Sequence, residues 1–417
     1  MPVETLTFGC RLNTVESAAM RGHAEAAAQD RDLVVVNTCA VTAEAGRQAR
    51  KAIRRLHRER PGAEIVVTGC GAQVETQAYA AMPEVARLVG NGDKLAPATW
   101  RPGQGGAREG RPRADVGDVF AARAIEPAPI ARIPGHTRAF VAVQNGCDHR
   151  CTFCVIPFGR GNSRSVPQAM VVDQVARIVA AGGREVVLTG VDLTAYGRDL
   201  SEPCRSLGTL VRAILAQVPD LARLRLSSID QIEADDALMR AVAEEPQLMP
   251  HLHLSLQAGD DTILKRMKRR HARADAIAFC AAVRRLRPGT VFGADLIAGF
   301  PTETEDGFAR SLDLVAECGL THLHVFPYSP RPGTPAARMP PVHPEIVRER
   351  AARLRAAGAA ALARHLDGEI GRTHRVLAER GGIGRTEGFT PVRVAAEPGA
   401  IVSVRVTGHD GRALIAA

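Results

Sequence analysis

The chain has 417 residues, 45% of them apolar, and a net charge of +9 at pH 7. This length allows several domains with proper cores, and the positive charge favours a polyanionic partner. No stretch has the length and apolarity to span a bilayer, and charged residues interrupt the N-terminus, so we expect a cytoplasmic protein with no membrane partner. Nine cysteines in that compartment favour metal or cluster ligation over disulfides.

Three short apolar runs near the N-terminus are each followed by a cysteine. The runs, predicted as strands separated by helices, cover residues 6–8, 33–36 and 65–67. Strands that alternate with helices predict a parallel α/β domain, here residues 1–98, and the carboxyl ends of its strands meet at one edge. Cys10, Cys39 and Cys70 are therefore expected to converge on a metal or cluster site, although single buried cysteines that only pack are common.

A basic stripe lies between the second and third of these strands. Its cations recur at helical spacing and are Arg47, Arg50, Lys51, Arg54, Arg55 and Arg58. The spacing predicts one face of a helix, with apolar residues on the other face. Such a stripe suits a phosphate backbone, and the alternative is an ordinary solvated face.

A stretch rich in Gly, Pro, Arg and Ala predicts a linker over residues 99–134. Cys147, Cys151 and Cys154 follow with the spacing C-x3-C-x2-C. Soft thiolates favour an iron–sulfur cluster or zinc, and three ligands leave one iron of a four-iron cluster open. Two alternatives are a buried helical stripe and a zinc site completed by His149.

Six apolar runs at regular spacing, with helical patterns between them, follow the linker. They cover residues 140–144, 185–189, 224–227, 251–257, 291–297 and 322–328. This alternation predicts a partial (β/α)6 barrel over residues 135–368, with its chemistry on the loops at the carboxyl ends of the strands. The three cysteines of the spaced motif follow the first run, where that chemistry belongs. Residues at or just past later strand ends are Gly190, Ser228, Gln257 and Gly299.

The end of the chain changes character. Residues 344–366 predict a helix, and the following short strand-like runs, separated by Gly-containing turns, predict a small antiparallel β-barrel over residues 369–417. Such barrels often bind RNA. The remaining cysteines, expected to pack on helical segments, are Cys204, Cys280 and Cys318.

This order of parts resembles the radical S-adenosylmethionine (SAM) methylthiotransferases over nearly the whole chain, with a tail similar to a TRAM domain. The matching stretches, besides the spaced cysteine motif, are Thr7–Asn13, Asn37–Thr42, Gly69-Cys70, Leu254–Gln257, Gly299–Glu305 and Tyr328–Arg331. The residues around Cys10 and Cys39 are most similar to the branch that modifies N6-threonylcarbamoyladenosine at position 37 of tRNA. The resemblance thus implies an enzyme that adds a methylthio group to C2 of that base, with tRNA as its partner.

The resemblance also implies cofactors and their ligands. Cys147, Cys151 and Cys154 would hold a [4Fe–4S] cluster that cleaves SAM to a radical, and Cys10, Cys39 and Cys70 would hold an auxiliary [4Fe–4S] cluster. One SAM methylates a sulfur on the auxiliary cluster, and the radical from a second SAM takes hydrogen from the adenine. An electron donor such as flavodoxin or ferredoxin is implied. Candidates for the SAM pocket are the strand-end residues Gly190, Asp192, Ser255, Gln257 and Gly299.

Alternatives remain for the substrate and for the class of protein. The same chemistry could act on isopentenyladenosine in tRNA or on an aspartate of a ribosomal protein, and an RNA-binding iron–sulfur protein without catalysis is a further possibility. A threonylcarbamoyl substrate carries a carboxylate that needs a cation or several hydrogen-bond donors. Arginines in the barrel and tail that could supply it are Arg160, Arg164, Arg331, Arg385 and Arg393.

Overall fold

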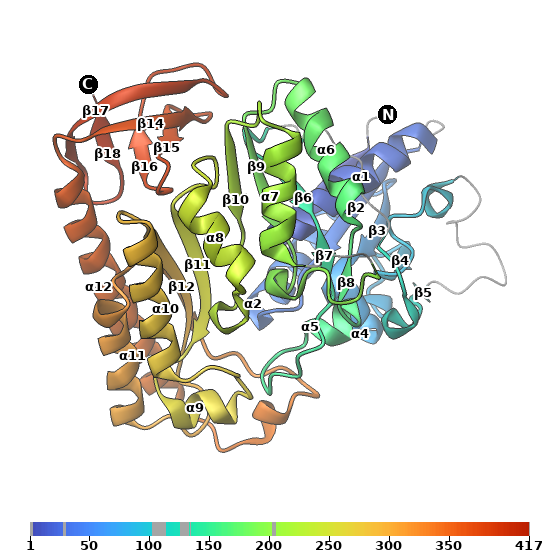
Figure 1. The fold of residues 1–417 in the computed structure, drawn as a ribbon. Coiled ribbons are helices and arrows are strands. Elements are labelled where there is room, and N and C mark those ends of the chain that lie inside the picture. The colour runs from blue at the N-terminus through green and yellow to red at the C-terminus, as the bar shows by residue number, and fades with distance from the viewer. Residues whose placement is uncertain are drawn as a thin grey trace.

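The computed structural model describes residues 3–27, 31–101, 114–125, 133, 135–201 and 206–416. These residues build a parallel α/β domain, an open barrel of six strands and a small closed β-barrel, in that order (Figure 1). The fold class predicted from the sequence is confirmed. Cys204 and much of the predicted linker lie outside the described residues. Within the described part of the chain, no helix combines the length and hydropathy required to cross a membrane.

The N-terminal sheet has five parallel strands arranged in chain order. They are β1 (Glu4–Thr7), β2 (Leu33–Thr38), β3 (Glu64–Thr68), β4 (Arg87–Val89) and β5 (Ala114–Asp115). The first three match the predicted strands. The last two are too short to give an apolar run, and β5 lies within the range predicted as a linker.

Helices cover both faces of this sheet. They are α1 (Arg11–Ala27), α2 (Ala43–Glu59), α3 (Gly69–Val74) and α4 (Thr76–Ala80). Because side chains alternate along a strand, Val34 and Val36 of β2 pack in one core with Ile53 of α2, and Val35 packs in the other with Met20 of α1. The Thr42 side chain caps α2 by accepting a hydrogen bond from the backbone N–H of Ala45 at 3.2 Å.

The open barrel consists of two three-stranded parallel sheets that continue each other as an arc (Figure 1). Its strands are β6 (Ala139–Ala142), β9 (Glu185–Thr189), β10 (Arg223–Leu226), β11 (His251–Gln257), β12 (Val291–Ala298) and β13 (Leu320–Pro327). A short antiparallel pair, β7 (Gln144–Asn145) and β8 (Arg164–Ser165), follows the first strand. All six predicted barrel strands are present.

The long helices of the barrel pack on its outer side (Figure 1). They are α6 (Gln168–Ala180), α7 (Leu207–Gln217), α8 (Asp236–Glu244), α10 (Arg273–Leu286), α11 (Glu305–Glu317) and α12 (Pro344–Glu369). The short helices α5 (Ile156–Arg160) and α9 (Asp261–Arg266) lie at the carboxyl ends of the strands, next to the cysteine loop. The helical pattern between the fourth and fifth predicted strands forms two helices, α9 and α10, because Lys268 lies between them with φ 58°. Cys280 and Cys318 are buried in this core, as predicted.

The alternation of β11 shows which side chains face the inside of the arc. Leu252, Leu254 and Leu256 belong to the main core shared with the outer helices. His253 and Ser255 therefore point to the opposite, concave face. This face leads toward the carboxyl ends of the strands, where the cysteine motif follows β6.

The closed barrel at the end of the chain has the strand order β14-β15-β16-β18-β17. Its strands are β14 (Thr373–Ala378), β15 (Ile383–Arg385), β16 (Pro391–Arg393), β17 (Ile401–His409) and β18 (Leu414–Ala416). The sequence missed β15, and the β16–β18 pair is parallel rather than antiparallel. This barrel lies at the amino ends of the large barrel's strands, away from the cysteine motif (Figure 1).

Two buried arginines on β10 hold the small barrel in place. Arg225 donates to the carbonyls of Thr386 and Glu387, each at 2.8 Å, and to the Glu185 carboxylate at 2.8 Å. Arg223 donates to the carbonyl of Arg385 at 3.1 Å. Phe389 has φ 70° and lies 5.1 Å beneath the Arg225 guanidinium. Since Glu185 is fully buried, its charge depends on these cations.

We predict that Arg225→Met loosens this junction, because it removes a cation from the buried Glu185 carboxylate together with two donors to the small barrel. The free energy of unfolding should fall by roughly 3 kcal/mol or more. Thermal unfolding and trypsin cleavage between the barrels would measure the effect. Arg393→Met is the control, because Arg393 makes an exposed ion pair with Asp410 that should contribute about 1 kcal/mol or less. Equal stability of the two variants would contradict the prediction.

Candidate cluster and cofactor site

The loop that carries Cys147, Cys151 and Cys154 is closed at its base by the β7–β8 pair, in which Gln144 lies opposite Ser165. Gly146 begins the loop with φ 75°, and a Cβ there would lie 1.9 Å from the Asn162 carbonyl oxygen. Only glycine fits this close approach. The motif is therefore a loop, as the flanking residues indicated, and the buried helical stripe is excluded.

The three cysteines of this loop are half-buried. Burial raises the pKa of Cys154 to about 12, with the nearby Cys151 adding to the effect, and burial also raises the pKa of Cys147. The Arg269 guanidinium lies 4.0 Å from the Cys151 sulfur and donates to the Asp230 carboxylate at 2.7 Å. Thiols must lose their protons to bind metal, and the Arg269 charge opposes the rise in the pKa of Cys154. The donor set thus fits an anionic iron–sulfur cluster.

Cys10, Cys39 and Cys70 lie directly after β1, β2 and β3, at one edge of the N-terminal sheet. Their thiols influence one another: burial raises the pKa of Cys39 to about 11, and Cys70 and Cys10 both contribute. The Asn13 amide donates to the carbonyls of Phe8 and Thr38, at 2.7 and 3.2 Å, and so joins the loops that hold the first two cysteines. The three cysteines thus lie at one edge of the sheet, with Cys10 and Cys70 near enough to Cys39 to act on its ionisation.

A buried charge network lies behind Cys70. The Arg160 Nε is 3.1 Å from the Cys70 sulfur, and its terminal nitrogens donate to the Glu16 carboxylate at 2.6 and 3.0 Å. Lys94 donates to the same carboxylate at 2.6 Å. Although burial alone would raise it, these two cations lower the pKa of Glu16 to about 2. Two cations on one carboxylate leave a net positive charge beside the thiols.

The sequence did not predict this network. Along the chain, Lys94 is 78 residues from Glu16 and Arg160 is 144 residues from it. No local pattern links the three residues. Arg160 was noted only as a possible cation for the substrate. The one available signal for this network was the Glu16 carboxylate in the helix that follows Cys10. This signal is not specific.

The two cysteine sets lie next to each other. Cys70 packs in one small cluster with Ala40 and Val155, and Val155 directly follows Cys154. The Cys70 thiol also contributes to the raised pKa of Cys154, after burial and Cys151. The two sets of thiols are therefore close neighbours.

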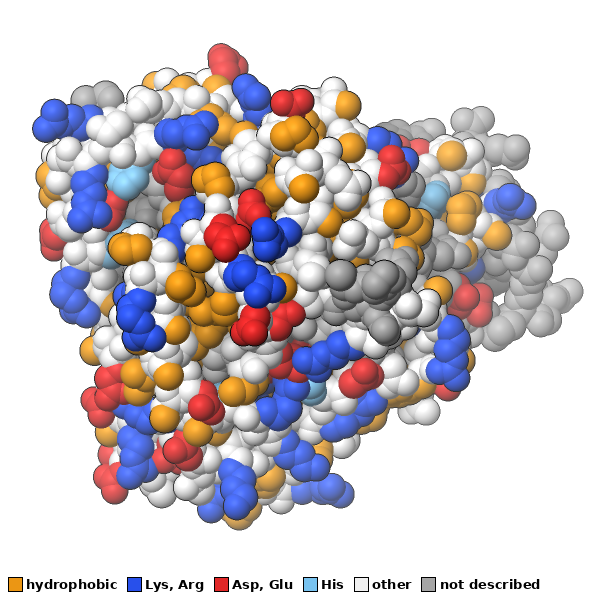
Figure 2. Space-filling model, in the orientation of Figure 1, with side chains coloured by type: hydrophobic (Ala, Val, Ile, Leu, Met, Phe, Trp, Pro, Cys, Tyr) orange, Lys and Arg blue, Asp and Glu red, His pale blue; other side chains and the backbone are white. Residues whose placement is uncertain are grey.

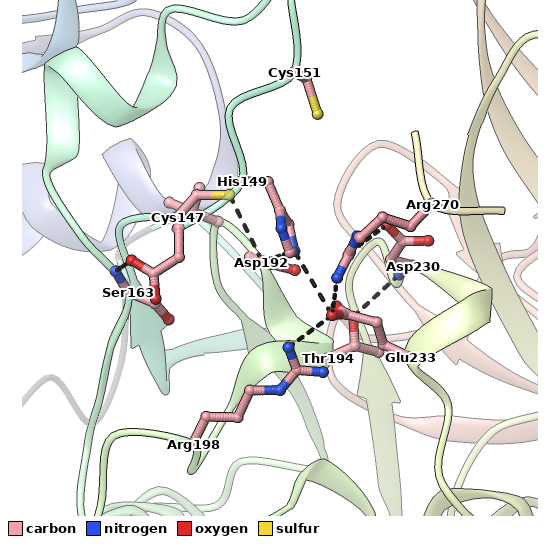
Figure 3. Close-up of polar contacts among 12 residues, drawn as sticks. Cys147, His149, Cys151, Ser163, Asp192, Thr194, Arg198, Asp230, Glu233 and Arg270 are labelled. Atoms are coloured by element: carbon pink, nitrogen blue, oxygen red, sulfur yellow. Dashed lines mark hydrogen bonds and ion pairs between the residues drawn. The ribbon is translucent and has the colours of Figure 1, made fainter. Parts of the chain in front are cut away.

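A polar network extends from the cysteine loop to the next strand ends (Figure 3). His149 Nε2 lies 2.9 Å from Asp192 and 3.6 Å from Glu233, and Glu233 also pairs with Arg198 at 2.8 Å. The contacts with Asp192 and Glu233 raise the pKa of His149 to about 9. Glu233 and Arg198 were not predicted.

The structure supports the alternative of a zinc site in this loop only in part. Cys147, His149 and Asp192 lie within 4.8 Å of one another, which is a possible metal set. It uses one of the three cysteines and leaves Cys151 and Cys154 without a role, so the three-thiol cluster accounts for more of the loop.

The predicted SAM-pocket residues lie at the carboxyl ends of their strands. Asp192 is 3.6 Å from the Cys147 sulfur, and the Ser255 carbonyl accepts a hydrogen bond from Arg269 at 2.8 Å. Gln257 has φ 69°. Gly299 has φ 74°, and its N–H donates to Glu303 at 2.9 Å. At Gly190 a Cβ would lie 2.8 Å from the Gln144 side-chain oxygen.

The predicted basic helix is α2. Gly46, Ala49, Ile53 and Leu56 form its buried face. The opposite stripe is exposed except for Arg50, which is half-buried and pairs with Glu75 at 2.9 Å.

Comparisons with known proteins agree with this arrangement. Residues 141–315 match the radical SAM superfamily, and residues 3–90 match a family described as uncharacterized protein family UPF0004. The chain is 46% identical over 392 residues to the threonylcarbamoyladenosine tRNA methylthiotransferase MtaB of Rickettsia prowazekii, covering 94% of this chain and 91% of that protein. It is 38% identical over 404 residues to the tRNA-2-methylthio-N(6)-dimethylallyladenosine synthase of Sorangium cellulosum, covering 89% and 80%.

A solved structure supports the fold. The radical SAM methyltransferase TsrM of Kitasatospora setae matches with a TM-score of 0.51 and 17% identity, over 77% of this chain and 66% of that one. Radical SAM proteins use SAM and a [4Fe–4S] cluster, and the thiol loop fits that cluster. Together with the sequence relatives, these findings show that the chain belongs to the radical SAM methylthiotransferase family.

Proposed function

We propose that the protein adds a methylthio group to C2 of N6-threonylcarbamoyladenosine at position 37 of tRNA. The observation that carries the substrate is the 46% identity to a relative named for this reaction, across 94% of the chain. The relative named for dimethylallyladenosine is 38% identical, so a prenylated adenosine is the second candidate. The ribosomal-protein and non-catalytic alternatives have no comparable support.

We assign the ligands by cysteine set. Cys147, Cys151 and Cys154 hold the [4Fe–4S] cluster that acts on SAM, and the N-terminal set, Cys10, Cys39 and Cys70, holds an auxiliary [4Fe–4S] cluster. When bound, these groups supply a carbon radical able to remove an unactivated hydrogen and the sulfur that replaces it. The net positive charge of the Arg160 network beside Cys70 supports the second assignment, since a cluster with three thiolates is anionic.

The residues around the loop position the reactants. In this proposal the SAM pocket is lined by residues at the carboxyl ends of neighbouring strands, which are Gly190, Asp192, Ser255, Gln257 and Gly299. A one-electron donor such as flavodoxin or ferredoxin supplies the reductant.

We also divide the chain by function. Residues 1–98 carry the auxiliary site, 99–134 connect it, 135–368 form the radical SAM core, and 369–417 form the TRAM-like barrel.

The cysteine assignments predict two separable losses of iron. Anaerobically reconstituted protein should hold about eight irons. Replacing Cys147, Cys151 and Cys154 with Ala should leave about half of the iron and abolish cleavage of SAM. Replacing the N-terminal set should also leave about half, but some cleavage to 5′-deoxyadenosine should survive. Unchanged iron in the second triple variant would show that the N-terminal cysteines are not ligands.

Two groups of exposed cations suit a phosphate backbone. Lys51 and Arg58 on α2 are exposed, and among the described residues they make no ion pair. Lys265, Arg266 and Lys268, in and after α9, are also exposed. Lys and Arg side chains gather along the lower edge of the face in Figure 2, where Figure 1 places α9. This helix flanks the cysteine loop, since the Thr152 N–H donates to the Met267 carbonyl at 3.1 Å.

Replacing both Lys51 and Arg58 with Ala should weaken tRNA binding and reduce its salt dependence. Each lost phosphate contact removes about one unit from the slope of log affinity against log salt concentration. Filter binding over a salt series would measure the slope. The double variant Arg348→Ala, Arg355→Ala is the control, because it removes two exposed cations from α12. If both variants keep the same slope, α2 is an ordinary solvated face.

The arginines predicted to meet the substrate carboxylate are engaged elsewhere. Arg160 pairs with Glu16 at 2.6 Å, and Arg331 pairs with Glu75. Arg164 donates to the Arg160 carbonyl at 2.6 Å, and Arg385 and Arg393 belong to the small barrel. Recognition of the carboxylate therefore depends on other groups of the concave face.

The substrate is tested by giving the reconstituted enzyme two tRNAs that differ only at position 37, with SAM, reductant and sulfide. We expect methylthio product from the threonylcarbamoyl tRNA and at least tenfold less from the prenylated tRNA. A site with polar groups for a carboxylate leaves them unpaired against a prenyl chain, at a cost of about 1–3 kcal/mol. Mass spectrometry of the nucleosides measures the outcome. Product from the prenylated tRNA alone would overturn the substrate and leave the radical chemistry intact.

A further inference from the structure

Three metal-ligating side chains converge on the concave face of the barrel, apart from the cysteine sets. They are His253 on β11, Asp295 on β12 and His324 on β13, which are neighbouring strands. His253 Nε2 lies 2.8 Å from Asp295 Oδ1, and His324 Nδ1 lies 3.1 Å from the same oxygen. One ligand atom of each residue lies within 4.8 Å of the other two.

The strand register builds this cluster. Asp295 pairs directly with His324, and His253 pairs with Gly293, two residues before Asp295. A Cβ at Gly293 would lie 2.5 Å from His253 Nδ1, so the bare backbone makes room for the imidazole. The rings of His253 and His324 have centroids 4.5 Å apart. The two histidines therefore approach the carboxylate from neighbouring directions.

Charge and exposure at the cluster suit a cation that also meets a ligand from solvent. The Asp295 carboxylate lies between the two imidazoles, within hydrogen-bonding distance of both. The side chain of His253 is 10% exposed and that of His324 is 62% exposed. One side of the cluster thus rests on the barrel and the other is open.

The layer beneath the cluster is formed by two more histidines, His251 and His322, whose rings are 5.8 Å apart. His251 is buried, and its ring stacks on Phe389 of the small barrel with centroids 5.0 Å apart. This layer therefore supports the strands that carry the cluster.

We propose that His253, Asp295 and His324 bind a divalent transition-metal ion of the Zn²⁺ class. Two imidazoles and a carboxylate are a common donor set for such ions. Bonds of about 2.0–2.2 Å in a tetrahedral site place ligand atoms roughly 3.3 Å apart, close to the two separations measured here. Three protein ligands leave a position open for water or an oxygen anion, as in sites that act on ligands rather than sites that only stabilise a fold.

The alternative is an aspartate that bridges two histidines by hydrogen bonds without a metal. The zinc content of the protein distinguishes a metal site from a hydrogen-bonded bridge. The reconstituted enzyme, with its cysteines occupied by clusters, is dialysed against buffered Zn²⁺ over a range of free concentrations. Zinc and iron per chain are then counted by mass spectrometry. His324→Ala and Asp295→Asn remove one ligand each, and His57→Ala removes an exposed imidazole from α2 as a control.

We expect about one zinc per chain in the unmodified protein and in His57→Ala. Zinc affinity should be at least tenfold weaker in His324→Ala and Asp295→Asn, while their iron content stays the same. Because His324 is largely exposed, its replacement should not disturb folding, and unchanged iron checks this. Equal zinc in all four proteins, or none in any, would overturn the proposal. The result does not depend on the tRNA substrate, so the proposed function stands or falls separately.

Discussion

The arrangement of the site depends on the buried carboxylate of Glu16. It accepts hydrogen bonds from Arg160, which follows the cysteine loop of the barrel, and from Lys94, which follows β4 of the N-terminal sheet. All three groups are removed from water, where charges without partners are costly. The N-terminal domain and the cysteine loop therefore keep a fixed relative position, with Arg160 directed at Cys70.

The same network leaves a net positive charge in the site, which an anionic ligand can balance. One carboxylate neutralises one of the two cations, and the remaining positive charge lies beside Cys70, near Cys39, whose pKa burial raises to about 11. A surplus cation in a buried space is costly. An anionic cluster bound by the N-terminal cysteines would balance this charge.

The sequence predicted those features of the fold that leave a local pattern along the chain. Apolar runs located the first three strands of the N-terminal sheet and all six barrel strands, and the cysteine spacing located the loop closed at Gly146. The sequence could not predict the break at Lys268 between α9 and α10, because this break depends on backbone conformation rather than on composition. Nor could it pair Glu16 with Arg160, because contacts between distant segments leave no periodic signal. The His253 cluster needed the register of three strands, which only the structure supplies.

The N-terminal domain, the outer helices and the small barrel leave the concave face of the large barrel open on only some of its sides. Outer helices cover the convex face, and Phe389 of the small barrel stacks on His251 at the amino ends of the strands, with ring centroids 5.0 Å apart. The N-terminal domain packs beside β6, where Arg11 lies 5.9 Å above the Phe140 ring. The exposed His324 is on β13, at the opposite edge of the arc from β6. The concave face is therefore more exposed at the β13 edge than at the β6 edge, which the N-terminal domain covers.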